Sequence, residues 1–312
     1  MTDTPSLSQT VEIYQSDFNS LTTSLFTALS GFAWDDGWRL KGCIDGPFCE
    51  RSDTLPATID LIDQGPGDGL LAAARVPDPC AWSADLPATY KLTTTLTCND
   101  ELFQQTSTPF SFRATEIRCP HFYRADLNGN YQRFVIRGAN QVLEDVLDSH
   151  AGEYRNEGLC CVATNPTAAD CLRALQQGVW ILAVIDHSAS SSIPQTVNQL
   201  NRWACVAGCV LHSDTSLPAS MSPGMRVPIG CWLADVAATI PDWAEFLMAD
   251  ASSGDGFNRQ FKFTDKPVVA AVEAPFESAR EARSACAQLQ KQLAPLGDYA
   301  GYTVFNNHLP FS

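Results

Sequence analysis

The sequence has little positive charge and no long apolar run. It contains 20 lysine and arginine residues against 35 aspartate and glutamate residues, for a formal net charge of −15. Proteins that bind nucleic acid use clustered lysine and arginine side chains to displace counterions from phosphates, so this balance argues against a nucleic-acid partner. No stretch approaches the roughly 18 consecutive apolar residues of a spanning helix, so we expect no membrane partner either.

Sorting and cofactor motifs are also missing. Residues 1–18 have neither a basic start nor an apolar stretch, so we expect no secretory signal and a cytoplasmic location. A Walker-type phosphate loop, a G-x-S-x-G elbow and an H-E-x-x-H helix are absent, and we predict no cofactor. The sequence leaves the oligomeric state open.

Twelve cysteines are present, but they are spread over 312 residues rather than concentrated in a small domain. Without a secretory signal, we interpret most of them as reduced thiols in the core. Cys205, Cys209 and His212 have a spacing that zinc ligands can have, yet no fourth ligand stands at a defined spacing. We therefore predict no metal site and read these cysteines as small, polarizable core residues.

The pattern of apolar residues changes near residue 115. Before it, short runs of β character alternate with turn-forming Gly, Pro, Asn and Asp residues, which predicts an immunoglobulin-like β-sandwich over residues 1–118. After it, near-continuous apolar runs alternate with helical patterns, as in parallel sheets that are buried on both faces. These runs are residues 133–140, 159–165, 179–186, 206–214, 227–234, 245–250, 267–274 and 299–306.

Eight such runs predict a compact (β/α)8 TIM barrel over residues 119–312, and a doubly wound open sheet is the alternative. Because this region is shorter than the roughly 250 residues of a typical TIM barrel, we expect some helices to be short or missing. Residues 251–266 do not look helical. Thr167 is placed to cap a helix that Gly178 ends, and residues 277–294 form an amphipathic helix that we expect to pack on the barrel.

Short motifs follow one another in a fixed order across the boundary between the two regions. They are Pro-x-x-Trp-Ser, Pro-x-x-Tyr, a Phe-Arg strand, an Asn-Gly turn and an Arg-Gly-x-Asn strand. The residues are Pro79, Trp82, Ser83, Pro87, Tyr90, Phe112, Arg113, Asn128, Gly129, Arg137, Gly138 and Asn140. In this order they resemble the immunoglobulin-like domain and the start of the barrel in glycoside hydrolase family 2, the β-galactosidase, β-glucuronidase and β-mannosidase group. The resemblance does not extend to that family's N-terminal jelly-roll domain, for which we expect no counterpart in this sequence.

The resemblance implies a retaining glycosidase site with two carboxyl groups, at the ends of strands four and seven. Ser213 and Asp214 stand where the family has Asn and Glu, and Glu273 stands at the nucleophile position. Asp is one methylene shorter than Glu, and a displacement near 1 Å costs about a hundredfold in rate. The catalytic candidates are thus Asp214 as acid/base and Glu273 as nucleophile. Each has a structural interpretation as well, Asp214 as an N-cap of the turn that follows it and Glu273 as a solvated strand end.

Other polar and aromatic residues are expected near the same rim, because the βα loops converge there. Asp186 and His187 form the most prominent pair, which a loop turn would explain equally well. The predicted substrate-binding residues are Arg137, Asn140, Asn165, Asp186, His187, His212, Trp232, Asp250 and Asn306.

Three functions are consistent with this reading. The first is a catalytically degenerate relative of glycoside hydrolase family 2 with a carbohydrate-recognition or scaffold role. The second is an active retaining glycosidase that uses Asp214 and Glu273. The third is a different barrel enzyme that uses Asp186, His187 and Asp250. The replacement of Asn and Glu by Ser213 and Asp214 at strand four favours the first function, because a shared fold does not by itself confer an activity when the site residues differ.

Overall fold

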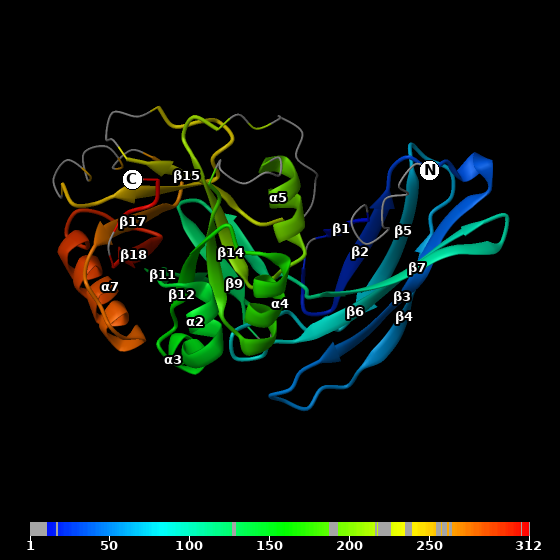
Figure 1. Ribbon diagram of the computed structural model, residues 1–312, viewed down its shortest axis with the longest axis horizontal. Coiled ribbons are helices and arrows are strands. Elements are labelled where there is room, and N and C mark those ends of the chain that lie inside the picture. Colours follow the sequence, from blue (N-terminus) through cyan, green and yellow to red (C-terminus); the bar gives the residue numbers. More distant parts are fainter. Residues whose placement is uncertain are drawn as a thin grey trace. The chain divides into compact units, whose positions relative to one another are not determined.

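The chain folds into two compact units (Figure 1), each of which is described by itself. The computed structural model describes residues 11–16, 18–126, 129–186, 193–215, 217, 226–234, 239–253, 257, 261, 264–306 and 308–311. The first unit comprises the described residues of Met1–Ala114, Asn201–Ala204 and Ser222–Arg226. The second comprises those of Thr115–Leu200, Cys205–Met221 and Val227–Ser312.

The first unit is an antiparallel β structure. Its seven strands form one sheet in the order β1-β2-β5-β4-β3-β6-β7. Their bounds are β1 Glu12–Gln15, β2 Thr22–Leu29, β3 Trp38–Phe48, β4 Ala57–Asp63, β5 Leu70–Pro77, β6 Thr89–Cys98 and β7 Glu101–Phe110. The predicted β architecture is confirmed. A β-sandwich has two packed sheets, whereas here β4 pairs with β3 up to Leu61 and then with β5 at Ile62 and Asp63, so all seven strands belong to one sheet.

The core of this unit follows the alternation along its strands. Leu25 and Leu29 of β2, Leu40 and Ile44 of β3, and Leu61 of β4 are all buried. Side chains two residues apart share a face of a strand, so these residues form one apolar face.

The motif residues Trp82 and Tyr90 are also buried, at 3% and 2% exposure. The Cys80 backbone N–H donates to the Tyr90 hydroxyl at 2.9 Å. Tyr90 therefore buries its ring while its polar tip is satisfied, as expected of a structural anchor.

The second unit is a closed barrel of eight parallel strands. Their bounds are β11 Ile136–Asn140, β12 Cys160–Thr164, β13 Trp180–Val184, β14 Val206–His212, β15 Ile229–Leu233, β16 Phe246–Asp250, β17 Val268–Glu273 and β18 Gly301–Phe305. Because β18 pairs with both β17 and β11, no edge is left open. Every predicted apolar run contains one of these strands, and closure excludes the open-sheet alternative.

The helices outside the barrel are short or few, as its length predicts. The described helices are α2 Leu143–Asp145, the π-helical turn η2 Val146–His150, α3 Ala151–Asn156, α4 Ala168–Gln177, α5 Ile193–Asn201 and α7 Ala279–Leu293. Thr167 caps α4 and Gly178 ends it with a φ of 73°, as predicted. The expectation for residues 251–266 lies partly outside the described residues. No described helix is long and apolar enough to cross a membrane.

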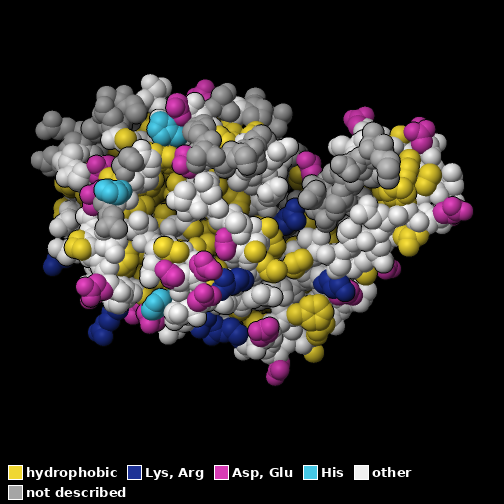
Figure 2. Space-filling view, viewed as in Figure 1, with side chains coloured by type: hydrophobic (Ala, Val, Ile, Leu, Met, Phe, Trp, Pro, Cys, Tyr) yellow, Lys and Arg dark blue, Asp and Glu magenta, His cyan; other side chains and the backbone are white. Residues whose placement is uncertain are grey.

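A small sheet lies at the N-terminal end of the barrel. It consists of β8 Thr115–Arg118, β9 His121–Ala125 and β10 Tyr131–Phe134. Phe122 of β9 packs edge-on against Phe246, the first residue of β16, with ring centroids 5.2 Å apart. The opposite end, where the strands finish, is therefore the end on which a site can be built. Acidic side chains are spread over the face of the molecule in Figure 2, in keeping with the net charge of −15.

Candidate functional site

The barrel register determines which strand-end side chains face inward. Arg137 of β11 bonds to α7 on the outside, so Asn140 faces the inside, because side chains alternate along a strand. Asn140 pairs with Phe305, and Phe305 pairs with Glu273, which gives Glu273 the same face. Continuing from strand to strand, the inward residues at the rim are Asn140, His212, Trp232, Asp250 and Glu273.

Asp214 and His212 form a close pair at the end of β14. His212 Nδ1 lies 2.5 Å from Asp214 Oδ1, and the Asp214 side chain is 71% exposed. The backbone N–H of Asp214 also lies 3.4 Å from Nδ1. A backbone N–H can donate only to an unprotonated Nδ1, whereas the carboxylate can accept only from a protonated one. The shorter contact, to the carboxylate, favours the tautomer with the proton on Nδ1. The Asp214 carboxylate therefore interacts with the His212 ring two residues before it.

Glu273 is held by the last described residues of the chain. The backbone N–H of Leu309 donates to Glu273 Oε1 at 3.3 Å. Two residues later, the ring of Phe311 packs edge-on against His212, with centroids 5.4 Å apart. Residues 308–311 therefore run across the rim from β17 to β14, between the two predicted catalytic positions.

The asparagines at the rim stabilise the backbone. Asn140 Oδ1 accepts the backbone N–H of Asn306 at 2.6 Å. The Asn306 side chain in turn bonds to both backbone groups of Phe276. Asn165, in the left-handed region with a φ of 47°, accepts the backbone N–H of Asp186. These amides shape the loops, and His187, the predicted neighbour of Asp186, lies outside the described residues.

Two other predicted substrate-binding residues offer no accessible side chain to a ligand at the rim. Trp232 points inward but is only 2% exposed, so its indole offers no open stacking face. Arg137 lies on the outer face of β11, where Nη2 donates to Gln290 Oε1 of α7 at 3.0 Å. Burial, and next the nearby Arg283, lower the pKa of Arg137. The alternation of the strand explains the difference, because an Arg-Gly-x-Asn strand cannot turn its Arg and its Asn to the same side.

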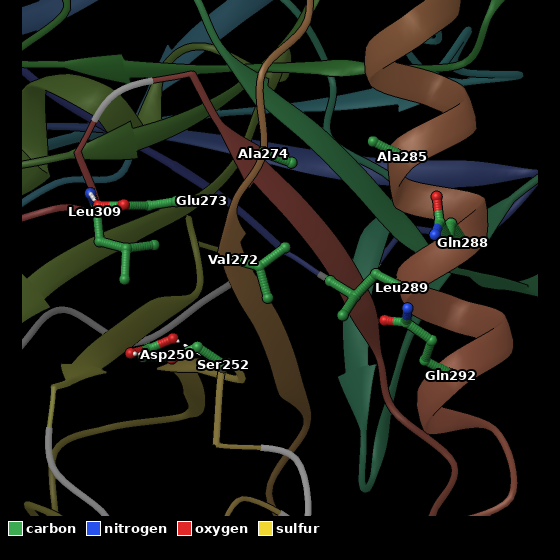
Figure 3. Close-up of a pocket in the computed structure, with 10 residues that line it drawn as sticks. All are labelled: Asp250, Ser252, Val272, Glu273, Ala274, Ala285, Gln288, Leu289, Gln292 and Leu309. Atoms are coloured by element: carbon green, nitrogen blue, oxygen red, sulfur yellow. Dashed lines mark hydrogen bonds between the residues drawn. The ribbon is translucent and has the colours of Figure 1, made fainter.

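A pocket opens beside the rim, between α7 and the ends of β16 and β17 (Figure 3). Its volume is about 520 Å³. Its lining residues are Asp250, Ser252, Val272, Glu273, Ala274, Ala285, Gln288, Leu289, Gln292 and Leu309. Asp250 is fixed there by Ser252, whose backbone N–H and hydroxyl each donate to one carboxylate oxygen, at 2.9 and 2.8 Å. Asp250 and Glu273, which end the adjacent strands β16 and β17, therefore both line this pocket.

The cysteines do not gather into a metal site. Cys209 and His212 occupy opposite faces of β14, so they cannot share an ion with Cys205, and the zinc alternative fails on geometry. All twelve cysteines are free thiols, seven of them buried. Within the described ranges no group of three or more His, Cys, Asp or Glu side chains could hold a metal ion.

The residues that the sequence did not predict are Ser252, Gln288, Gln292, Leu309 and Phe311. Gln288 and Gln292 lie four residues apart on α7, so their spacing alone indicated a shared helix face. Leu309 acts through its backbone N–H, which leaves no signal in the sequence.

Solved structures of bacterial glycosidases have the same fold. The β-glucuronidase of Bacteroides uniformis matches with a TM-score of 0.62 and 11% identity, over 95% of this chain and 45% of that one. The Parabacteroides merdae β-glucuronidase has a TM-score of 0.57 and 12% identity, over 95% and 46%. The Bifidobacterium dentium β-glucuronidase has a TM-score of 0.58 and 12% identity, over 95% and 60%.

This chain spans about half the length of these structural neighbours. No protein-family model matches the sequence, and no curated protein matches it. At such low identity the likeness shows the fold. It supports the β unit and barrel that the resemblance to glycoside hydrolase family 2 implied.

Proposed function

We propose that this protein is a glycoside hydrolase-like protein that recognises carbohydrate and no longer hydrolyses it. In this proposal residues 1–118 form an immunoglobulin-like domain and residues 119–312 a degenerate glycosidase barrel. The fold shared with β-glucuronidases supports the class of ligand. The substitution of Ser213 and Asp214 at strand four supports the loss of catalysis.

The state of the two strand-end carboxyl groups carries the proposal. In a retaining glycosidase the proton donor sits in an apolar pocket and faces the nucleophile across the bond to be cleaved. Here the Asp214 side chain is 71% exposed and is bound to His212. Glu273 accepts a backbone N–H from Leu309, and the same segment covers His212 with Phe311. In this proposal residues 308–311 take up the space that a substrate would need between the two carboxyl groups, and their contacts with Glu273 and His212 support it.

An active retaining glycosidase is the second candidate. Its support is that Asp214 follows β14, the fourth barrel strand, and that Glu273 ends β17, the seventh. Displacement of residues 308–311 would be required before a sugar reached both carboxyl groups.

An assay with 4-nitrophenyl β-glycosides tests the proposal. We expect the galactoside, glucuronide, glucoside and mannoside to release no nitrophenol faster with the wild type than with Glu273→Gln. The shorter Asp214 side chain and the replacement of the family's Asn amide by Ser213 weaken two transition-state contacts, each worth about 2 to 4 kcal/mol, which would leave little turnover. A burst of nitrophenol that Glu273→Gln abolishes would instead establish the second candidate. Calorimetry with the same sugars, as methyl glycosides, tests recognition directly, and failure of every sugar to bind would leave only a scaffold role.

A further inference from the structure

The pocket beside the rim has the size and chemistry of a small-molecule site. Its volume of about 520 Å³ falls within the roughly 300 to 1,000 Å³ of ligand pockets. Figure 3 shows Val272 pointing toward Leu289 of α7, while Glu273 points to the other side of β17, toward Leu309. The pocket therefore lies on the flank of the barrel, and Glu273 borders both the pocket and the rim.

We propose that this flank pocket, and not the barrel axis, binds a neutral saccharide. This inference rests on the proposed function of carbohydrate recognition and specifies where the sugar binds and which sugars are accepted.

The polar groups of the pocket match vicinal hydroxyls. Gln288 and Gln292 are exposed and lie one turn apart on α7, and within the described ranges neither side-chain amide has a hydrogen-bond partner. Each amide supplies two donors and an acceptor. Asp250 and Glu273 also line the pocket, from the rim side of β17, and their carboxylate oxygens accept from hydroxyl groups. Because Ser252 holds the Asp250 carboxylate through two hydrogen bonds, that side is preorganised.

The floor of the pocket is apolar. Val272 and Ala274 of the β17 end and Ala285 and Leu289 of α7 line it. A pyranose presents C–H groups on its faces and hydroxyls at its edge, so an apolar floor with polar walls fits it. A flat aromatic or a lipid tail would leave the carboxylates and amides unpaired, which is costly.

The charge of the pocket selects against acidic ligands. Its lining includes two carboxylates and no lysine, arginine or histidine. A uronic acid or a phosphate would meet repulsion from Asp250 and Glu273 without a compensating cation. The sugar is therefore neutral, in contrast to a glucuronide.

Calorimetric titration of the folded chain with methyl β-galactoside, methyl β-glucoside, methyl β-mannoside, cellobiose and glucuronic acid tests this inference. We expect at least one neutral sugar to bind and glucuronic acid to bind more weakly. The double variant Gln288→Leu/Gln292→Leu should weaken binding at least about tenfold, the loss expected for one or two hydrogen bonds. Ala285→Phe, which fills the pocket without removing a polar group, should weaken it as well. Ser284→Leu, an exposed position on α7 outside the pocket, is the matched control and should bind like the wild type.

The outcomes separate this inference from the function on which it rests. Neutral-sugar binding that survives both pocket variants but is lost in His212→Ala would overturn the flank site and leave carbohydrate recognition standing. Failure of every sugar to bind would overturn both. Binding of the diamine putrescine, but of no sugar, in a Gln288-dependent manner would show that the carboxylates serve a cation, and would also overturn the inference. Circular dichroism and thermal unfolding verify that each variant is folded.

Discussion

Gly230 shows how a single residue fixes the barrel interior. It pairs with Phe246 across β15 and β16, and an added Cβ would lie 2.3 Å from Phe246 Cζ. Real Cβ atoms do not approach so closely, and the ring is itself packed against Phe122. The absence of a side chain at Gly230 is therefore what makes room for the aromatic ring.

We expect Gly230→Ala to destabilise the barrel by about 1 to 3 kcal/mol, the usual cost of overpacking a core. Urea unfolding followed by circular dichroism measures this loss. The double variant Gly230→Ala/Phe246→Leu should recover part of it, because the smaller side chain relieves the clash. Gly152→Ala in α3 is the control, since its nearest contact would be Arg155 Nη2 at 3.8 Å. Equal losses for the two single variants would contradict this account.

Residue chemistry also shows why the site was only partly predictable. The sequence correctly indicates that Glu273 and Asp250 end barrel strands, because apolar runs end there. It does not indicate that Asp214 turns to His212, since both groups are polar and either could point elsewhere. The contact from Leu309 to Glu273 depends on backbone placement 36 residues away in sequence.

At the scale of elements, local signals were the most reliable. The helix α4 begins after its N-cap residue Thr167 and ends before Gly178, because both caps are encoded within a few residues. The barrel strands were recognisable because strands buried on both faces are continuously apolar. By contrast, the change of partner along β4 depends on pairing between distant segments, which alternation alone does not specify.

The cap of α4 gives a prediction at this scale. Thr167 Oγ1 accepts the Asp170 backbone N–H, and the Asp170 carboxylate accepts the Thr167 backbone N–H at 2.9 Å. We expect Thr167→Ala to lower the free energy of unfolding by about 1 kcal/mol. Chemical denaturation measures the change. Ser284→Ala, at an exposed position inside α7, should leave stability unchanged or slightly higher, because alanine is the better helix former. A loss with Ser284→Ala as large as with Thr167→Ala would refute the capping role.

For the whole molecule, fold and site depend on different parts of the sequence. The fold is shared with β-glucuronidases at 11 to 12% identity, because many different apolar residues satisfy the same strand and helix patterns. A site needs particular groups at particular distances, and such low identity does not preserve them. This is why the barrel could be predicted from the sequence, whereas the engagement of Asp214 and Glu273 by the chain had to be seen in three dimensions.

The distribution of cysteines between the two units leads to a prediction for the entire chain. The seven buried cysteines all belong to the barrel unit, whereas Cys119 is exposed and the other four are half-buried. Burial raises the pKa of Cys171 and of Cys209 to about 12. Because the thiolate is the reactive species, only about one part in ten thousand of such a thiol is reactive at pH 8.

We therefore expect a thiol reagent at pH 8 to modify Cys119 first in the native protein, the half-buried cysteines more slowly, and the seven buried ones only on unfolding. Denatured protein without reductant should yield all twelve thiols. The variant Cys119→Ser should lose the fast phase and nothing else, which assigns that phase to one site. Modification of Cys209 at the rate of Cys119 would mean that the barrel opens in the native state. Fewer than twelve thiols after denaturation would mean that some cysteines are paired, and the interpretation of the buried cysteines as reduced core residues would then be wrong.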